Sequence, residues 1–143
     1  MPLGLGKKRG QVSFEFLVLV GFILVFIAII ASVAFMIFSD SFTSQQTTDA
    51  VQILEKSVNH VYGLGAGNVV VISITLPGTV SDSFVGGLSG KELGFTATTL
   101  AGDQNYWIQT DSTVTGFLPT ASGTFSIRVR ADVNAVTLET VTG

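Results

Sequence analysis

The chain has 143 residues, a formal net charge of −3 and no cysteine. Without cysteine, neither a disulfide framework nor a zinc site built on thiolates is available. Three of the seven Lys and Arg residues lie before residue 10, so residues 11–143 carry four cations against ten acids, a net charge of 4 − 10 = −6. This acidic balance argues against nucleic-acid binding, which requires a basic surface that neutralises phosphates.

The chain begins with a short basic leader, residues 1–10, followed by an apolar helix predicted over residues 11–38. Residues 16–38 form a run of 23 positions without a charge, in which Ser32 is the only clearly polar residue. At about 1.5 Å per residue the run is roughly 34 Å long as a helix, enough to cross a hydrocarbon core of about 30 Å. Because cations stay on the cytoplasmic side, we expect everything after this run to face outside the cell.

A more polar helical continuation is predicted over residues 39–62. Residues 39–48 are rich in Ser, Thr and Gln, which leaves open whether the helix continues there or breaks. Asp49 and Gln52 have the spacing of a capping box that would restart it. The glycine-rich residues 63–67 are expected to end the helix. Before them, one apolar stripe recurs at three- and four-residue spacing and indicates a packed face: Val51, Leu54, Val58 and Val61.

Residues 63–143 are predicted to form an extracellular, β-rich head domain. The apolar period changes there from 3.6 to two, with alternating sets over residues 70–76, 93–97, 125–131 and 136–141. Short, regularly punctuated strands favour a small antiparallel sandwich, or a sheet packed on the helix stripe. The expected fold class is therefore α+β, a long N-terminal apolar helix followed by a small antiparallel β-sandwich-like head.

The segment with the clearest functional pattern lies where the leader meets the apolar helix. Glu15 stands at the head of the apolar run, where a charged side chain costs up to about 3 kcal/mol and usually has a partner. A plain signal anchor gives no reason for a carboxylate at this place. The surrounding residues follow the pattern Q-x-S-x-E-x-x-x-L after a basic cluster. The motif comprises Lys7, Lys8, Arg9, Gly10, Gln11, Ser13, Glu15 and Leu19.

This segment resembles the class III signal sequence of archaeal type IV-like pilins. The resemblance covers residues 7–38, and the β-rich remainder agrees with such pilins in general layout. It implies that a membrane-embedded prepilin peptidase cuts on the cytoplasmic side between Gly10 and Gln11, leaving the apolar helix on the mature protein. It also implies a subunit that lies in the cell membrane before assembly and then polymerises with copies of itself into an extracellular adhesion pilus. A cytoplasmic assembly ATPase and a membrane platform protein would be its further partners.

In such a filament the apolar helices would pack in a common core. After cutting, the ammonium of Gln11 lies four residues from Glu15, and we expect the carboxylate to pair with the free amine of a neighbouring subunit. That pair would fix subunit register more than it stabilises, since buried ion pairs seldom give large net gains. Large rings around small residues suit helix packing, although they also suit lipid contact. The predicted packing residues are Phe14, Phe16, Gly21, Phe22, Phe26, Ala31, Phe35 and Phe38.

Two other fates of the N-terminal segment remain open. The small-x-small sequence ending at Ala34 fits an ordinary signal peptidase, which would release a secreted chain. An uncut chain would instead be a single-pass membrane protein that holds an extracellular binding module and does not polymerise.

The sequence contains no clear pattern of catalytic residues, and we expect no catalytic residue, metal or cofactor. His60 is the only histidine, so a transition-metal site is not expected. Asp103, Asp111 and Asp132 lie in loop-like stretches, where aspartate commonly serves turns. Tyr106 and Trp107 are strand neighbours that point to opposite faces, and Trp107 is expected to be the one in the core.

Overall fold

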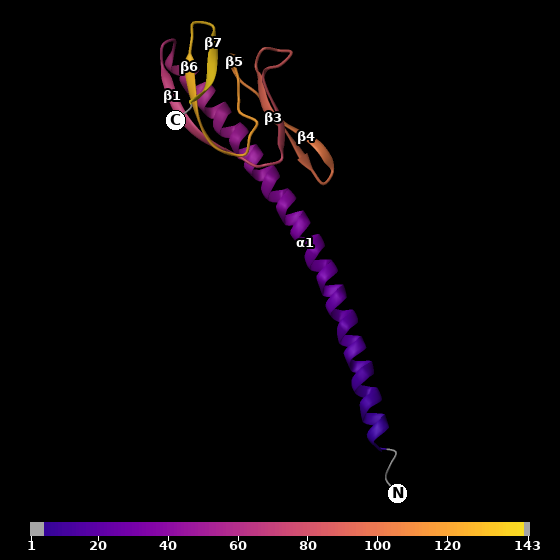
Figure 1. Cartoon of the computed structure of the whole chain (residues 1–143). Coiled ribbons are helices and arrows are strands. Elements are labelled where there is room, and N and C mark those ends of the chain that lie inside the picture. The colour runs from indigo at the N-terminus through magenta and orange to yellow at the C-terminus, as the bar shows by residue number, and fades with distance from the viewer. Residues whose placement is uncertain (1–4, 142–143) are drawn as a thin grey trace. The chain divides into compact units, whose positions relative to one another are not determined.

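A computed structural model describes residues 5–141 of the chain, with side chains from residue 10 onward. Within these residues, one helix is followed by seven strands, and Figure 1 shows their arrangement. The chain divides into two compact units, of which the first ends at Ser39 and the second begins at Asp40. The predicted α+β class is confirmed. The elements are α1 (Leu5–Leu64), β1 (Val69–Leu76), β2 (Val80–Gly86), β3 (Glu92–Thr99), β4 (Gly102–Gln109), β5 (Thr113–Gly116), β6 (Gly123–Ala131) and β7 (Ala135–Val141).

Helix α1 continues through the polar residues 39–48, where the sequence left a break open. The hydroxyl of Thr47 donates to the carbonyl of Thr43 at 2.9 Å, so this polar side chain is satisfied within the helix. The helix ends at Leu64, because Gly65 turns to φ +93° and its N–H donates to the carbonyl of Tyr62 at 3.1 Å. The glycine-rich segment thus ends the helix as predicted.

Two sheets form the head. One is four-stranded with the order β1-β6-β7-β5, and the other is three-stranded with the order β2-β3-β4 (Figure 1). All pairs are antiparallel except β5 with β7, which is parallel, so the larger sheet is mixed. The alternation predicted for β3 and β6 is confirmed by burial. Their inward side chains are Leu93, Phe95, Ala97, Phe125, Ile127, Val129 and Ala131.

The stripe predicted on the second half of α1 forms part of the head's hydrophobic core. Val51 is 4% exposed, and Leu54, Val58 and Val61 are fully buried. They belong to one cluster with buried residues of both sheets. Fully burying a large aliphatic side chain contributes about 1.5–3 kcal/mol, so the stripe holds residues 50–61 of α1 firmly within the second unit.

Three long-range hydrogen bonds, from positions between Asp40 and Asn59 of α1, fix the helix to the head. The hydroxyl of Tyr106 donates to Oγ of Ser44 at 2.8 Å. The backbone N–H of Leu100 donates to Oδ1 of Asp40 at 3.0 Å, and that of Asp111 to Oδ1 of Asn59 at 3.1 Å. Polar side chains of α1 therefore set its register against β4 and the loops at both ends of that strand.

The prediction for Trp107 is wrong. Its side chain is 58% exposed, whereas Tyr106 and Ile108, on the other face of β4, pack against the core. Alternation required only that neighbours on the strand point in opposite directions. The hydroxyl of Tyr106 finds its partner on α1, and this contact places the tyrosine inside and the indole outside.

Candidate functional site: an exposed apolar helix segment

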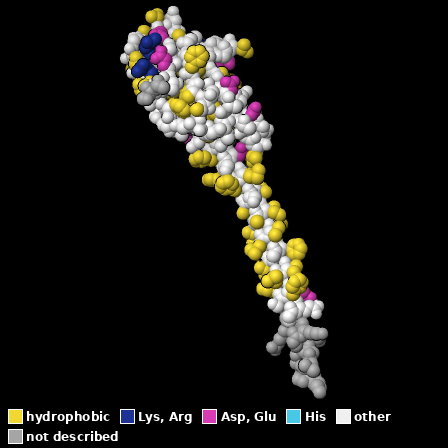
Figure 2. All heavy atoms as spheres, in the orientation of Figure 1, with side chains coloured by type: hydrophobic (Ala, Val, Ile, Leu, Met, Phe, Trp, Pro, Cys, Tyr) yellow, Lys and Arg dark blue, Asp and Glu magenta, His cyan; other side chains and the backbone are white. Residues whose placement is uncertain are grey.

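The first unit of the chain presents an apolar surface to its surroundings. Every side chain from Gly10 to Ser39 is exposed. Figure 2 shows hydrophobic side chains following one another along this part of α1 on the face in view. A soluble helix normally confines its apolar residues to one stripe, and a helix that is apolar all round is found in a membrane or inside a larger assembly. In the isolated chain, the segment therefore lacks the lipid or the neighbouring helices that would cover its apolar surface.

The same segment is long and apolar enough to cross a bilayer. The most apolar window of the helix between Gly10 and Leu64 has a mean hydropathy of 3.2. The one hydroxyl within residues 16–38 is satisfied locally, because Oγ of Ser32 donates to the carbonyl of Ala28 at 2.8 Å. Such local bonding is what a hydrocarbon environment demands of a polar side chain. Length, composition and exposure together indicate membrane association or secretion.

The structure brings two residues of the predicted processing motif together. Nε2 of Gln11 donates to Oε1 of Glu15 at 3.4 Å, across one turn of the exposed helix. Ser13 lies two residues from each and therefore faces another side of the helix. Leu19 is 57% exposed. The side chains of Lys7, Lys8 and Arg9 lie outside the described residues.

The predicted cleavage point lies within regular helix. Gly10 and Gln11 are both helical and exposed, and no heavy atom lies within 4 Å of where a Cβ of Gly10 would be. No packing contact therefore requires glycine here. Glycine inside a helix costs about 1 kcal/mol relative to alanine, so Gly10 weakens the helix next to the predicted cleavage point.

The predicted packing residues all lie on the surface of this segment. The six phenylalanines are between 65% and 72% exposed. Gly21 leaves open space at its Cβ position and, with Val18, Phe22 and Val25, lines a shallow apolar groove. Ala31 is exposed as well. Small residues beside large rings allow close approach of another helix.

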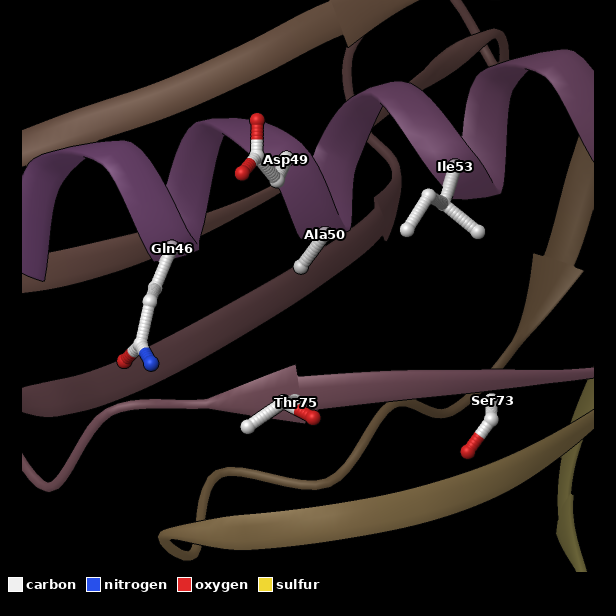
Figure 3. A pocket seen from close by; sticks show the side chains of 6 residues that line it. All are labelled: Gln46, Asp49, Ala50, Ile53, Ser73 and Thr75. Atoms are coloured by element: carbon white, nitrogen blue, oxygen red, sulfur yellow. The ribbon is translucent and has the colours of Figure 1, made fainter.

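In the second unit a polar groove runs between α1 and β1, an edge strand of the larger sheet. Figure 3 shows Gln46 and Ala50 pointing toward β1, whereas the carboxylate of Asp49 points away from it. Strand β1 contributes Ser73 and Thr75. The groove has no charged side chain directed into it, and nothing in it resembles a catalytic arrangement.

Among the described residues no three His, Cys, Asp or Glu side chains are grouped to hold a metal ion. Arg128 pairs with Glu139 at 3.7 Å and Arg130 with Asp132 at 3.3 Å, and all four are about half exposed. Exposed pairs of this kind contribute little to stability.

Sequence reasoning missed the residues that attach α1 to the head, chiefly Asp40 and Ser44. Their partners lie 60 and 62 residues away along the chain, so no local pattern marks them. The change from an apolar to a Ser- and Asp-containing sequence at residue 39 is the one signal that the helix enters a new environment there.

The chain has the architecture of a pilin-like protein, a long apolar N-terminal helix followed by a β head. No family model matches it, and no curated protein or solved structure is significantly similar to it.

Proposed function

We propose that this protein is the structural subunit of an archaeal type IV-like adhesion pilus. The proposal rests on three features that occur together in one helix. The residues that match the prepilin processing motif stand at its start, and the segment after them is apolar and exposed on all sides. The same helix then continues into a folded β head. The role is structural rather than enzymatic. The subunit would lie in the cell membrane before assembly and in an extracellular filament afterwards.

Exposure explains why such a segment would polymerise. Each large apolar side chain gains about 1.5–3 kcal/mol when it leaves water, which keeps the segment in lipid or in a filament core. Transfer from lipid to the filament core brings little further hydrophobic gain, so packing must favour assembly. The open space at Gly21, flanked by Phe22, is suited to receive a ring from a neighbouring helix.

Glu15 would give the assembly its register. In the isolated chain its carboxylate is exposed and accepts a bond from the side chain of Gln11. In a filament core it would lose water and require a stronger partner. Cutting between Gly10 and Gln11 creates an ammonium group, and the ammonium of a neighbouring subunit would serve. Prepilin peptidase, an assembly ATPase and a membrane platform protein complete the set of proposed partners.

The intact mass of the mature native protein, with sequencing of its N-terminus, tests the processing step. We expect a chain that begins at Gln11. A chain that begins at Phe35 would mean ordinary secretion. A chain that begins at Met1 would mean a membrane-anchored binding module that does not polymerise. Either result would overturn the pilus proposal.

Replacement of Glu15 tests the assembly step. We expect E15A and E15Q to insert into the membrane normally and to lower the yield of sheared filaments at least tenfold, measured by electron microscopy and immunoblotting. The matched control is E55A, a carboxylate of the same helix in the second unit. A normal filament yield from E15A and E15Q would show that the carboxylate has no role in register.

A further inference from the structure

The turn between β3 and β4 carries apolar side chains at its tip. Its two residues are Leu100, which is 58% exposed, and Ala101, which is exposed as well. Tight turns are dominated by Gly, Pro, Asn, Asp and Ser, and the loops of the β2–β3 and β6–β7 hairpins follow that rule, for example with Gly87 and Asp132. In the β3–β4 hairpin the positive φ of +102° falls on Gly102, the first residue of β4. Backbone geometry therefore gives no reason for an exposed leucine in this turn.

Several polar groups of the same turn are bonded within the protein. The backbone N–H of Leu100 donates to Oδ1 of Asp40 at 3.0 Å. The N–H of Ala101 donates to Oγ1 of Thr99 at 3.3 Å, and the hydroxyl of Thr99 donates to the carbonyl of Gly102 at 2.9 Å. An unbonded polar group is costly in an apolar environment, and an internal bond removes much of that cost. The turn can therefore leave water without giving up these bonds.

The bond to Asp40 fixes the turn at the beginning of the second unit. Asp40 is the second residue after the uncharged run of residues 16–38. When that run spans a bilayer, the residues next to it lie in the headgroup region, which is roughly 5–7 Å thick on each side of the hydrocarbon core. The bond from Leu100 to Asp40 thus places the turn at the level of the lipid headgroups.

Charge narrows the kind of lipid that the turn would contact. Strands β3 and β4 contain no lysine or arginine. Lys91 stands just before β3, at the other end of that strand, and Lys56 lies about 24 Å further along α1 than Asp40. Asp40 and Asp103, the acids beside the turn, would repel anionic headgroups. The turn therefore fits the boundary between hydrocarbon and neutral headgroups, where apolar contact does not depend on basic side chains.

We propose that the β3–β4 turn is an interfacial anchor, in which Leu100 and Ala101 insert among the lipids while the apolar helix spans the membrane. Asp40 is the positioning residue, because it holds the turn against α1. The inference rests on the proposed membrane position of the subunit before assembly and adds to it the orientation of the head on the bilayer. Interfacial anchors set the tilt and rotation of a spanning helix, so this second contact would limit both.

The test uses full-length chains with one tryptophan each, in vesicles of phosphatidylcholine with brominated acyl chains. W107F removes the only native tryptophan. In that background, L100W reports on the turn and F26W on the spanning helix. The matched control is L88W, because Leu88 is fully exposed in the loop at the other end of β3, at least about 23 Å away along the strand (Figure 1). We expect bromine to quench L100W at least threefold more than L88W.

The outcomes separate the anchor from the membrane position on which it rests. Quenching of F26W without quenching of L100W would overturn the anchor and leave the spanning helix intact. Failure of bromine to quench F26W would remove the membrane position, and the anchor with it. Equal quenching of L100W and L88W would contradict a specific role of the turn. A response of L100W to filament assembly in place of lipid would assign the turn to a neighbouring copy and also overturn the proposal.

Variants of Asp40 test whether the bond to α1 positions the turn. In the L100W chain, D40A removes the acceptor of the N–H of residue 100, and we expect quenching to fall at least twofold. D40N keeps a side-chain oxygen that can accept this bond, so it should restore the quenching. Both variants leave the buried stripe of α1 unchanged, and near-ultraviolet circular dichroism checks that both heads are folded. Unchanged quenching in D40A would show that Asp40 does not position the turn.

Discussion

The two halves of α1 belong to one unbroken helix and differ in how their apolar residues are distributed. Residues 10–39 carry exposed apolar side chains on every side. Residues 40–64 confine their buried apolar side chains to one face, made of Ala50 and the stripe of Val51, Leu54, Val58 and Val61. A stripe can be satisfied by one partner surface, and the head supplies that surface. A helix that is apolar all round cannot be satisfied by one surface, so it needs lipid or several neighbouring helices. The distribution of apolar side chains around the helix axis thus distinguishes the half that packs on the head from the half whose apolar surface is covered only by lipid or other helices.

The largest expected effect is a loss of stability of the head when a buried residue of the stripe is truncated. Leu54 is fully buried, so we expect L54A to lower the free energy of unfolding of the head by about 3 kcal/mol. Leu24 is 61% exposed, and L24A should leave that free energy unchanged. Denaturant unfolding of the full chain in detergent, followed by near-ultraviolet circular dichroism, measures both. Equal losses in the two variants would contradict the division of α1.

A charge placed on the apolar half of α1 tests whether that half crosses a membrane. Phe26 is 65% exposed, so F26K should leave the stability of the head unchanged. A lysine in the middle of a membrane span costs about 3 kcal/mol, and we expect a marked fall in the fraction of chain inserted during cell-free translation with membranes. The control Q45K places the same charge on the exposed surface of the second half. Equal insertion of F26K and Q45K would argue against a spanning role for residues 16–38.

A smaller loss of stability is expected from a substitution at the C-terminal end of α1. Gly65 has φ +93° with open space around it, so an added Cβ is opposed by backbone strain alone. We expect G65A to destabilise the head by about 1 kcal/mol. Gly63 is still helical and equally uncrowded, so G63A should be neutral or slightly stabilising. The difference in thermal midpoint between the two variants is the measurement, and a result of the opposite sign would show that the helix does not end at this glycine.

The smallest effect concerns the bond between β4 and α1. Loss of the hydroxyl in Y106F leaves Oγ of Ser44 without its donor, and we expect a loss of about 1 kcal/mol in unfolding free energy. Tyr62 is 44% exposed and makes no side-chain hydrogen bond within the described residues, so Y62F serves as control. Denaturant unfolding compares the two. A cost no greater than that of Y62F would mean that the bond does not hold β4 in place.

Patterns in the sequence predicted the parts of the fold that depend on neighbouring residues. The alternation in β1, β3, β6 and β7 was readable because each strand places one apolar set inward. Strand β5 has four residues and pairs in parallel with β7, whose sequence lies far along the chain. Strand β4 carries mostly polar residues on an edge, so its hydrophobic signal is weak. These strands depend on pairing partners that no local pattern identifies.

The candidate site likewise has features that the sequence shows directly and features that only tertiary contacts decide. The processing motif, the basic leader and the apolar run are contiguous, so the sequence shows them directly, and the contact between Gln11 and Glu15 follows from helical spacing. The functions proposed for them stay predictions until the mature N-terminus and the filaments are measured. The exposure of Trp107 was not foreseen, because alternation does not say which face of β4 is covered.

The sequence by itself determined the secondary structure with strong periodicity, the uncharged run and the acidic balance of the head, since each depends on residue type and spacing along a single element. The tertiary structure decided which face of β4 is buried, that the larger sheet is mixed and that α1 continues through residues 39–48. The physical reason is that these features depend on contacts between residues distant in sequence. The bond from Tyr106 to Ser44, 62 positions apart, exists only once β4 has packed against α1.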